Sequence, residues 1–257
     1  MKDINYLKQN NVDVDKSLEL FGDIETYNET LVEFQHSIDT KLAEIEKYYK
    51  EGDMPNYAIY VHSLKSDCKY FGFTKLAEIS YDHELKSKAG DINYVRENYA
   101  PLITEAARVK NIINEYLGAN ENVTITSETL GEDIILVADD SEVVRAFVKK
   151  IFDADYDLAF AGNGEETLNI IKTHQNDNRI KAILLDLNMP KVDGFAVLDY
   201  LKANNLLKTM PVTIISGDSS SDAINKAFTY DIVDMLNKPF SEQKIKDAVE
   251  KTINQAR

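Results

Sequence analysis

Charged and hydroxyl side chains follow the ends of short apolar runs in the second half of the chain. The groups that could do chemistry there are Asp139, Asp140, Asp186, Ser216 and Lys238. If the runs are parallel strands, their carboxyl ends meet at one edge of a sheet, where ligands bind in folds of this kind. Three carboxylates at one edge would repel one another unless a cation lay between them, and oxygen ligands without His or Cys favour Mg²⁺ over Zn²⁺. A lysine and a hydroxyl beside that ion would suit an anion, and we expect phosphate.

A second candidate group lies on a predicted helix in the first half, within the segment NYAIYVHSLKSDCKYFG (56–72). An apolar stripe at helical spacing consists of Val61, Leu64, Cys68 and Phe71. His62 falls on another face and is expected to be exposed, with Lys65 one turn further along. A lone helical histidine is usually an ordinary surface residue. Here, however, Lys65 offers positive charge to an incoming phosphate, and the small Ser66 lets a partner approach the ring.

The elements that would position the histidine make up an all-helical first part of the chain. Apolar residues recur at steps of three and four, which predicts a short first helix and longer ones near 31–49, 56–71, 74–88 and 92–117. Thr74 is expected to cap the third long helix and Pro101 to kink the fourth. Helices joined by short connections predict an antiparallel bundle.

From Ile134 the pattern changes to short runs rich in Ile, Leu and Val, separated by helical segments. The apolar runs span 134–138, 158–162, 182–186, 212–216 and 232–236. The helical segments lie near 141–152, 164–174, 194–204, 220–228 and 241–255. Strands that are apolar on both faces and alternate with helices predict a doubly wound, five-stranded parallel sheet.

The segment between the two patterns is polar and has no helical period. It predicts a domain organisation of a bundle at 1–117, a linker at 118–133 and an α/β domain at 134–257. Val123 and Ile125 could form a short strand within the linker.

Composition narrows the classes of function. The 257 residues include 44 acidic and 29 basic side chains, for a formal charge of −15, which makes nucleic acid a poor first choice of partner. The single cysteine, Cys68, excludes an intrachain disulfide, is expected to be a buried small hydrophobe, and favours a reducing cytoplasm. No apolar run reaches the roughly 18 residues of a membrane span, and the N-terminal sequence lacks the apolar core of a secretory signal.

Residues 133–257 resemble the response-regulator receiver family. The motifs that carry the resemblance are ILVADDS (135–141), LLDLNMPKVDGF (184–195), IISGD (214–218) and NKPF (237–240), in the family's order and spacing. The resemblance implies that Asp186 accepts a phosphoryl group. The implied Mg²⁺ ligands are Asp140, Asp186 and the backbone carbonyl of Asn188, with Asp139 acting largely through water. Ser216 and Lys238 would each bind a phosphoryl oxygen.

Two further features follow from the same resemblance. The bond between Lys238 and Pro239 is expected to be cis, as in the family. The family usually places Tyr or Phe three residues before the lysine, as a side chain that rotates inward upon phosphorylation, and here that residue is Met235. A flexible thioether fills space but does not act as an aromatic switch.

The helix that contains His62 resembles the histidine phosphotransfer (HPt) family, whose motif is H-x-L-K-G followed by a later glycine. The sequence HSLKSDCKYFG matches at His62, Leu64, Lys65 and Gly72, with Ser66 in place of the first glycine. The likeness covers about residues 10–117 and implies a bundle that carries a phosphoryl group on its histidine. The remaining histidines, His36, His83 and His174, are interpreted as surface or structural residues.

Together these features predict a phosphorelay protein that holds a histidine and an aspartate acceptor. No ATP-binding motif occurs, so we do not expect an enzyme beyond the receiver's own phosphorylation and dephosphorylation. The expected partners are a sensor histidine kinase and other receiver domains, without membrane insertion, and the oligomeric state is open. A linker of about fifteen residues spans roughly 20 Å, so phosphate is expected to move between His62 and Asp186.

Three alternatives stay open at this level. The receiver could gate access to His62, or the chain could be a docking adaptor that transfers no phosphate. An aspartyl-phosphate hydrolase would also use a strand-end aspartate with Mg²⁺. Enzymes of that class normally have a second aspartate as acid/base two residues after the nucleophile, and this chain has Asn188 at that position.

Overall fold

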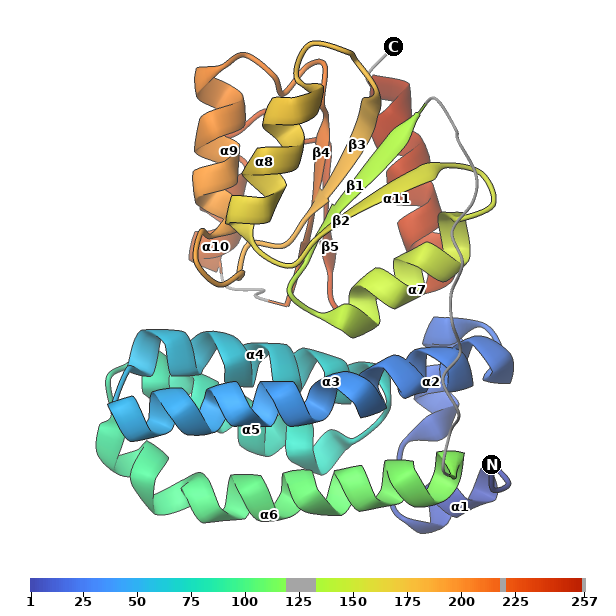
Figure 1. Ribbon diagram of the computed structural model, residues 1–257, viewed down its shortest axis with the longest axis vertical. Coiled ribbons are helices and arrows are strands. Elements are labelled where there is room, and N and C mark those ends of the chain that lie inside the picture. The colour runs from blue at the N-terminus through green and yellow to red at the C-terminus, as the bar shows by residue number, and fades with distance from the viewer. Residues whose placement is uncertain (119–132, 218–220, 256–257) are drawn as a thin grey trace. The chain divides into compact units, whose positions relative to one another are not determined.

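The structure is a computed structural model that describes residues 1–118, 133–217 and 221–255. The chain forms two compact units, Met1–Ile125 and Thr126–Arg257, and each is described by itself (Figure 1). The predicted fold class is confirmed, because a helical unit is followed by a doubly wound, five-stranded parallel sheet. The interior of the predicted linker, with the short strand considered at Val123 and Ile125, lies outside the described residues.

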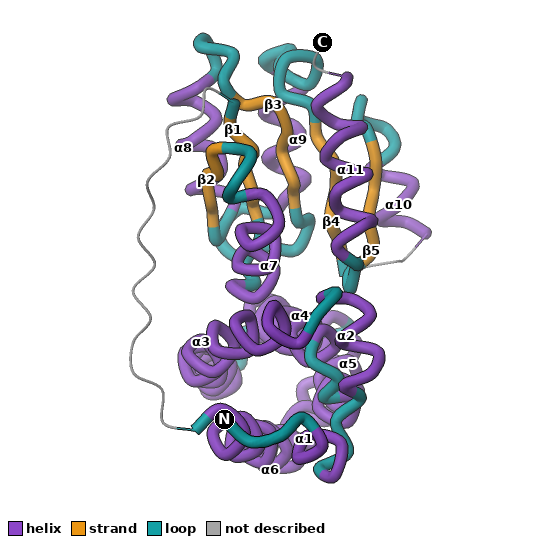
Figure 2. The backbone as a smooth tube through the Cα atoms, turned by 90° about the vertical axis from the view of Figure 1, so that its right-hand side faces the viewer, coloured by secondary structure: helices purple, strands orange, loops and turns teal. Residues whose placement is uncertain are grey.

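The first unit is helical throughout its described part. Its helices are α1 (Asn5–Gln9), α2 (Val14–Phe21), α3 (Ile24–Glu51), α4 (Met54–Tyr70), α5 (Thr74–Lys88) and α6 (Ile92–Leu117). The four long helices pack α3 on α4, α4 on α5, α5 on α6 and α6 on α3, in the ring that Figure 2 shows end-on. Two short helices precede them rather than one, and α6 continues through Pro101.

Aspartates begin three of the long helices. Asp23, Asp53 and Asp91 each accept a hydrogen bond from the backbone N–H three residues later, at 2.8, 3.2 and 3.1 Å. Helix α5 starts differently, because Phe73 occupies the cap position and makes no side-chain capping bond. The expectation that Thr74 caps this helix is therefore wrong, and Thr74 is its first helical residue.

Gly72 joins α4 to α5 at a point where only glycine fits. Its φ of +75° lies in the left-handed region, and a Cβ there would lie 2.4 Å from the carbonyl oxygen of Asp13. The Asp13 N–H donates to the Gly72 carbonyl at 2.9 Å. The glycine that follows the His62 helix thus fastens that helix to the start of α2.

The second unit is a parallel sheet with strand order β2-β1-β3-β4-β5. Its strands are β1 (Ile134–Ala138), β2 (Asp157–Ala161), β3 (Ile180–Leu185), β4 (Val212–Ser216) and β5 (Asp234–Asn237). Its helices are α7 (Glu142–Phe152), α8 (Gly164–His174), α9 (Gly194–Ala203), α10 (Ser221–Ala227) and α11 (Glu242–Gln255). All of the predicted strands and helices of this unit are present, with ends shifted by at most two residues.

Helices cover both faces of the sheet, which explains why its strands are apolar on both sides. Helices α7 and α11 lie on one face, and α8, α9 and α10 lie on the other (Figure 2). Every residue of β1 is buried. Among the described residues, no helix combines the length and the apolar character that crossing a membrane requires.

Candidate functional site

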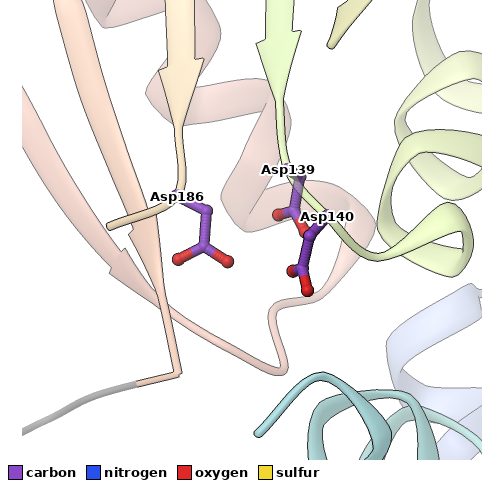
Figure 3. A group of neighbouring side chains, drawn as sticks. All are labelled: Asp139, Asp140 and Asp186. Carbon is purple, nitrogen blue, oxygen red and sulfur yellow. The ribbon is translucent and has the colours of Figure 1, made fainter. Parts of the chain in front are cut away.

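Three carboxylates meet at the carboxyl edge of the sheet, as the sequence predicts. Strands β1 and β3 are parallel neighbours with Ala138 opposite Leu185, so the residues that follow them emerge side by side. Asp139, Asp140 and Asp186 each offer an oxygen within 4.8 Å of the others. Figure 3 shows Asp139 and Asp140 following one strand and Asp186 following the other.

Lys238 places a buried cation against two of these carboxylates. Its Nζ donates to Asp186 Oδ2 at 2.5 Å and lies 2.6 Å from Asp139 Oδ2. Burial raises the pKa of the Asp139 carboxyl to about 7, even though the Lys238 ammonium opposes the shift. Burial alone would lower the pKa of Lys238, but Asp139 and Asp186 raise it above its ordinary value. The lysine therefore stays charged, and the site has more negative than positive groups.

The donor set of this edge fits a small divalent cation. Three carboxylates offer hard oxygen ligands, no histidine or cysteine is among them, and Asp139 and Asp186 are fully buried. Mg²⁺ prefers such ligands and uses few of them from protein. The three aspartates that were predicted to bind the metal are thus brought together, and the role of the Asn188 carbonyl stays a prediction.

The loops beside Asp186 hold its carboxylate in place. The backbone N–H of Asn188 donates to Asp186 Oδ1 at 3.1 Å. Gly194 begins α9, and a Cβ there would lie 2.2 Å from the Asp186 carbonyl oxygen, so only glycine allows this approach. Ser216 ends the neighbouring strand β4, is fully buried, and accepts a hydrogen bond from Lys238 N–H through its carbonyl. The expected cis bond between Lys238 and Pro239 is confirmed.

A second cluster surrounds His62 in the helical unit. The Nδ1 atom of His62 lies 2.7 Å from Oε1 of Glu84, which is on α5. Lys65 donates to Glu84 Oε2 at 2.6 Å, and Lys88 donates to Glu84 Oε1 at 2.7 Å. The Nε2 atom of His62 is buried and has no hydrogen-bond partner in the described part of the chain.

The charge of Glu84 decides which nitrogen of His62 carries the proton. Burial alone would raise the pKa of Glu84, but its hydrogen bonds to His62 and Lys65 and the positive charge of Lys65 hold that pKa well below its ordinary value. An ionised carboxylate can only accept hydrogen bonds. His62 Nδ1 therefore carries a proton and donates a hydrogen bond to Glu84. Lys65 Nζ, 3.1 Å from Nδ1, donates to Glu84 instead. In the neutral form of the ring, the lone pair is therefore on Nε2.

The expectation that His62 is exposed is wrong, because 1% of its surface is accessible. Lys65 and Ser66 are buried as well. The apolar stripe of α4 is buried as predicted, but α5 packs along α4 and brings Glu84 to the ring. Glu84 was not predicted from the sequence, because it is 22 residues from His62 and the only available signal was a carboxylate on the helix that follows.

The other residues singled out by sequence have structural positions. His36 is exposed, and His174 pairs with Asp177. His83 is buried between the Tyr57 hydroxyl and the Asn98 carbonyl. Cys68 is fully buried, as expected, and burial raises the pKa of its thiol. Met235 lies in β5 and packs against the apolar core on the α8 and α9 side of the sheet.

The sheet order and the acidic edge define a receiver domain, and comparison with known proteins agrees. The family model of the response regulator receiver domain matches residues 135–250. "Probable methanogenesis regulatory protein FilR2" of Methanothrix harundinacea is 30% identical over 125 residues, which cover 46% of this chain and 79% of that protein. The chain belongs to the response regulator receiver family. Its second unit therefore takes part in two-component signalling through a phosphoaspartate.

Other relatives are longer proteins that match about half of this chain. "Probable C4-dicarboxylate response regulator DctR" of Priestia megaterium is 33% identical over 120 residues, which cover 46% of this chain and 50% of that protein. "Sensor histidine kinase CheAY" of Helicobacter pylori is 26% identical over 149 residues, covering 58% of this chain and 18% of that protein. The chain thus spans half or less of these two relatives.

Solved receiver structures are similar to about half of this chain. A response regulator receiver domain protein from Clostridium thermocellum is 27% identical, with a TM-score of 0.43, over 48% of this chain and 95% of that one. The receiver domain of Francisella response regulator 1452 is 31% identical, with a TM-score of 0.43, over 49% of this chain and 99% of that one.

Proposed function

We propose that the chain is a phosphorelay protein with two phosphoacceptors, Asp186 in the receiver and His62 in the helical bundle. Membership of the receiver family supports the aspartate. One observation carries the histidine: an ionised Glu84 fixes the proton on Nδ1 and leaves Nε2 as a lone pair without a hydrogen-bond partner among the described residues. This is the nucleophilic form of imidazole, which accepts phosphoryl groups.

At the acidic edge, an Asp186 carboxylate oxygen attacks the phosphorus of a donor. A new O–P bond forms while the donor's bond to phosphorus breaks and its leaving group departs with the electron pair. Asp139, Asp140, Asp186 and the Asn188 carbonyl would hold Mg²⁺, which supplies positive charge for the phosphoryl oxygens. The ammonium of Lys238 leaves Asp186 for a phosphoryl oxygen, and the Ser216 hydroxyl donates to another.

At the bundle, Nε2 of His62 attacks the phosphorus of an aspartyl phosphate. The N–P bond forms as the P–O bond to the aspartate breaks, and the aspartate leaves as a carboxylate. The ring becomes positive as it reacts, and the Glu84 carboxylate on Nδ1 stabilises that charge. Lys65 and Lys88 keep Glu84 ionised and offset the charge of the incoming phosphoryl group.

The partners that suit this chemistry are a sensor histidine kinase, which supplies phosphate, and separate receiver domains, which exchange it with His62. The acidic composition argues against a nucleic-acid target. Catalysis is limited to the chain's own phosphorylation and dephosphorylation, and we place the protein in a reducing cytoplasm because its single cysteine is a buried thiol.

Phosphorylation of the full chain by acetyl phosphate with Mg²⁺ tests the aspartate. Asp186→Asn should abolish an acid-stable, alkali-labile label, whereas Asp247→Asn, at an exposed position on α11, should not. Labelling that persists in Asp186→Asn contradicts the assignment.

Transfer from a phosphorylated receiver tests the histidine. His62→Gln should lose the acid-labile label, while His36→Gln on the exposed side of α3 should keep it. Circular dichroism checks that both variants are folded. Equal acid-labile labelling of the two variants would remove His62 from the relay.

The burial of His62 favours a second candidate, in which the phosphorylation state of the receiver controls access to the ring. The two candidates differ when an Asp186→Asn chain phosphorylated on His62 is mixed with a His62→Gln chain. Exchange predicts that phosphate appears on Asp186 of the second chain. Gating predicts none, together with a rate of His62 labelling that changes when Asp186 is phosphorylated.

A further inference from the structure

Arg145 reaches from the first turn of α7 to the backbone beside the acidic edge. Its Nη1 donates to the carbonyl oxygen of Asp139 at 2.5 Å, and its side chain is 20% exposed. That carbonyl belongs to the peptide unit between Asp139 and Asp140. The hydrogen bond therefore fixes the orientation of the peptide that joins two of the proposed metal ligands.

Other hydrogen bonds also hold the same short segment. Ser141 N–H donates to Asp139 Oδ1 at 2.9 Å, and the Ser141 hydroxyl caps α7 by accepting from Val144 N–H at 3.2 Å. Asp139 N–H donates to the Ala161 carbonyl at 3.0 Å. These hydrogen bonds orient the side chain and the N–H of Asp139. The hydrogen bond from Arg145, in contrast, orients the peptide unit that joins Asp139 to Asp140.

The same Nη1 atom of Arg145 also lies near the loop between β2 and α8. A Cβ at Gly162 would lie 3.6 Å from Arg145 Nη1 and 3.7 Å from Glu166 Oε2. Glu166 in turn accepts from Gly162 N–H at 2.9 Å and from Asn163 Nδ2 at 2.7 Å. The guanidinium is thus oriented between the Asp139 carbonyl and a loop whose carboxylate is itself held.

That second loop also contacts the segment that follows Asp186. Gly164 N–H donates to the Val192 carbonyl at 3.1 Å, and a Cβ on Gly164 would lie 2.2 Å from the same oxygen. The loop contributes no carboxylate to the acidic cluster. It nevertheless packs against both segments that do, and Arg145 lies at one of those two contacts.

We propose that Arg145 is a positioning residue of the metal site, which fixes the peptide between Asp139 and Asp140 so that both carboxylates face the ion. The inference rests on the proposed Mg²⁺ site. Two effects of Arg145 on a cation have opposite signs. Its positive charge near the site weakens cation binding, and its hydrogen bond strengthens cation binding by holding the ligands in place.

Substitution by methionine removes the charge and the hydrogen bond together and keeps much of the aliphatic side chain. Because the two effects have opposite signs, the direction of the change in Mg²⁺ affinity shows which of them is larger. Positioning predicts that Arg145→Met binds Mg²⁺ about tenfold or more weakly, as when groups that orient metal ligands are lost. A simple charge effect predicts tighter binding. The control is Arg179→Met, whose arginine pairs with Asp157 at the opposite end of the strands.

The experiment is titration of the full chain with Mg²⁺ alone, followed by calorimetry, with circular dichroism melting in EDTA to compare stability. Wild-type binding that is lost in Asp186→Asn locates the site. Weaker binding in Arg145→Met, with Arg179→Met within twofold of wild type, supports the inference. Binding in Arg145→Met that equals or exceeds wild type overturns it and leaves the metal site standing. Wild-type chain that binds no Mg²⁺ at Asp186 overturns the metal site and this inference together.

Arg145→Lys provides the test if the methionine variant fails to fold. Lysine keeps the charge but lacks the planar fork, so affinity should still fall several-fold relative to Arg179→Lys. Equal affinities of these two lysine variants would overturn the inference.

Discussion

The acidic edge of the receiver and the His62 cluster of the bundle carry opposite excesses of charge. At the edge, Asp139, Asp140 and Asp186 bring three carboxylates to one place, and Lys238 brings one ammonium. In the bundle, one carboxylate contacts two ammonium groups and an imidazole. The edge therefore has an excess of negative charge, and the bundle cluster has an excess of positive charge.

The difference explains what each cluster can accept. An excess of buried carboxylates stabilises a divalent cation, which then attracts phosphoryl oxygens. Under the proposed function, the positive cluster around the imidazole suits a direct approach of the phosphoryl group, without a metal. We therefore expect Mg²⁺ to affect the receiver strongly and the bundle very little.

The largest effect should come from removing the cation of the acidic edge. Lys238→Met leaves buried carboxylates without their partner, and we expect the receiver to lose about 3–5 kcal/mol of its free energy of unfolding. Mg²⁺ should restore much of that loss, because it replaces the missing charge. Urea unfolding monitored by circular dichroism, with and without Mg²⁺, measures both quantities.

The matched control is Lys251→Met, which removes a more exposed lysine from its pair with Asp234. This variant should lose less than about 1 kcal/mol, with no response to Mg²⁺ beyond that of wild type. If the two lysine variants behave alike, the contrast between the two clusters is wrong on the receiver side.

Removing the negative charge of Glu84 should give the next largest effect. Glu84→Gln keeps an oxygen that accepts from His62 Nδ1 but loses the charge that stabilises a positive ring, so phosphoryl transfer to His62 should slow about tenfold. The rate is measured with a phosphorylated receiver and rapid quenching. Glu105→Gln is the control, since Glu105 is also buried and contacts two cations but lies on α6. Equal slowing in both would assign the effect to general loss of packing.

The smallest effect concerns acid stability of the bundle. The pKa of Glu84 is lower in the folded chain than its unfolded value of 4.5, because its bonds to His62 and Lys65 outweigh burial. This pairing stabilises the fold fully above about pH 4.5 and is lost as the pH falls toward the folded pKa. The melting temperature of the bundle should therefore fall with pH below 4.5, and less steeply in Glu84→Gln. Parallel curves for the two proteins would exclude Glu84 as the source.

Much of the receiver could be predicted because its signals are local. Each apolar run bounded by polar residues is long enough for one buried strand, and parallel strands place their carboxyl ends at one edge. The candidate residues then lie at the strand ends or within two residues of them, so their approximate places do not depend on details of packing. These residues are Asp139, Asp140, Asp186, Ser216 and Lys238.

The His62 cluster was harder because it depends on how two helices are rotated against each other. The spacing of Val61, Leu64 and Cys68 correctly marks the buried stripe of α4, but not the width of the covered surface. The contact of His62 with Glu84 depends on how α5 packs along α4, which the spacing of residues on α4 does not specify.

By itself the sequence determined the two fold classes, the receiver motifs and the meeting of three carboxylates, because strand period and strand ends are local properties. Tertiary structure alone decided that Glu84 fixes the proton of His62 and that Arg145 holds the peptide between Asp139 and Asp140. The first contact joins α4 to α5, and the second joins α7 to the loop that follows β1. Hydrogen bonds of this kind require correct distance and direction to within a fraction of an ångström, and spacing along the chain does not specify either.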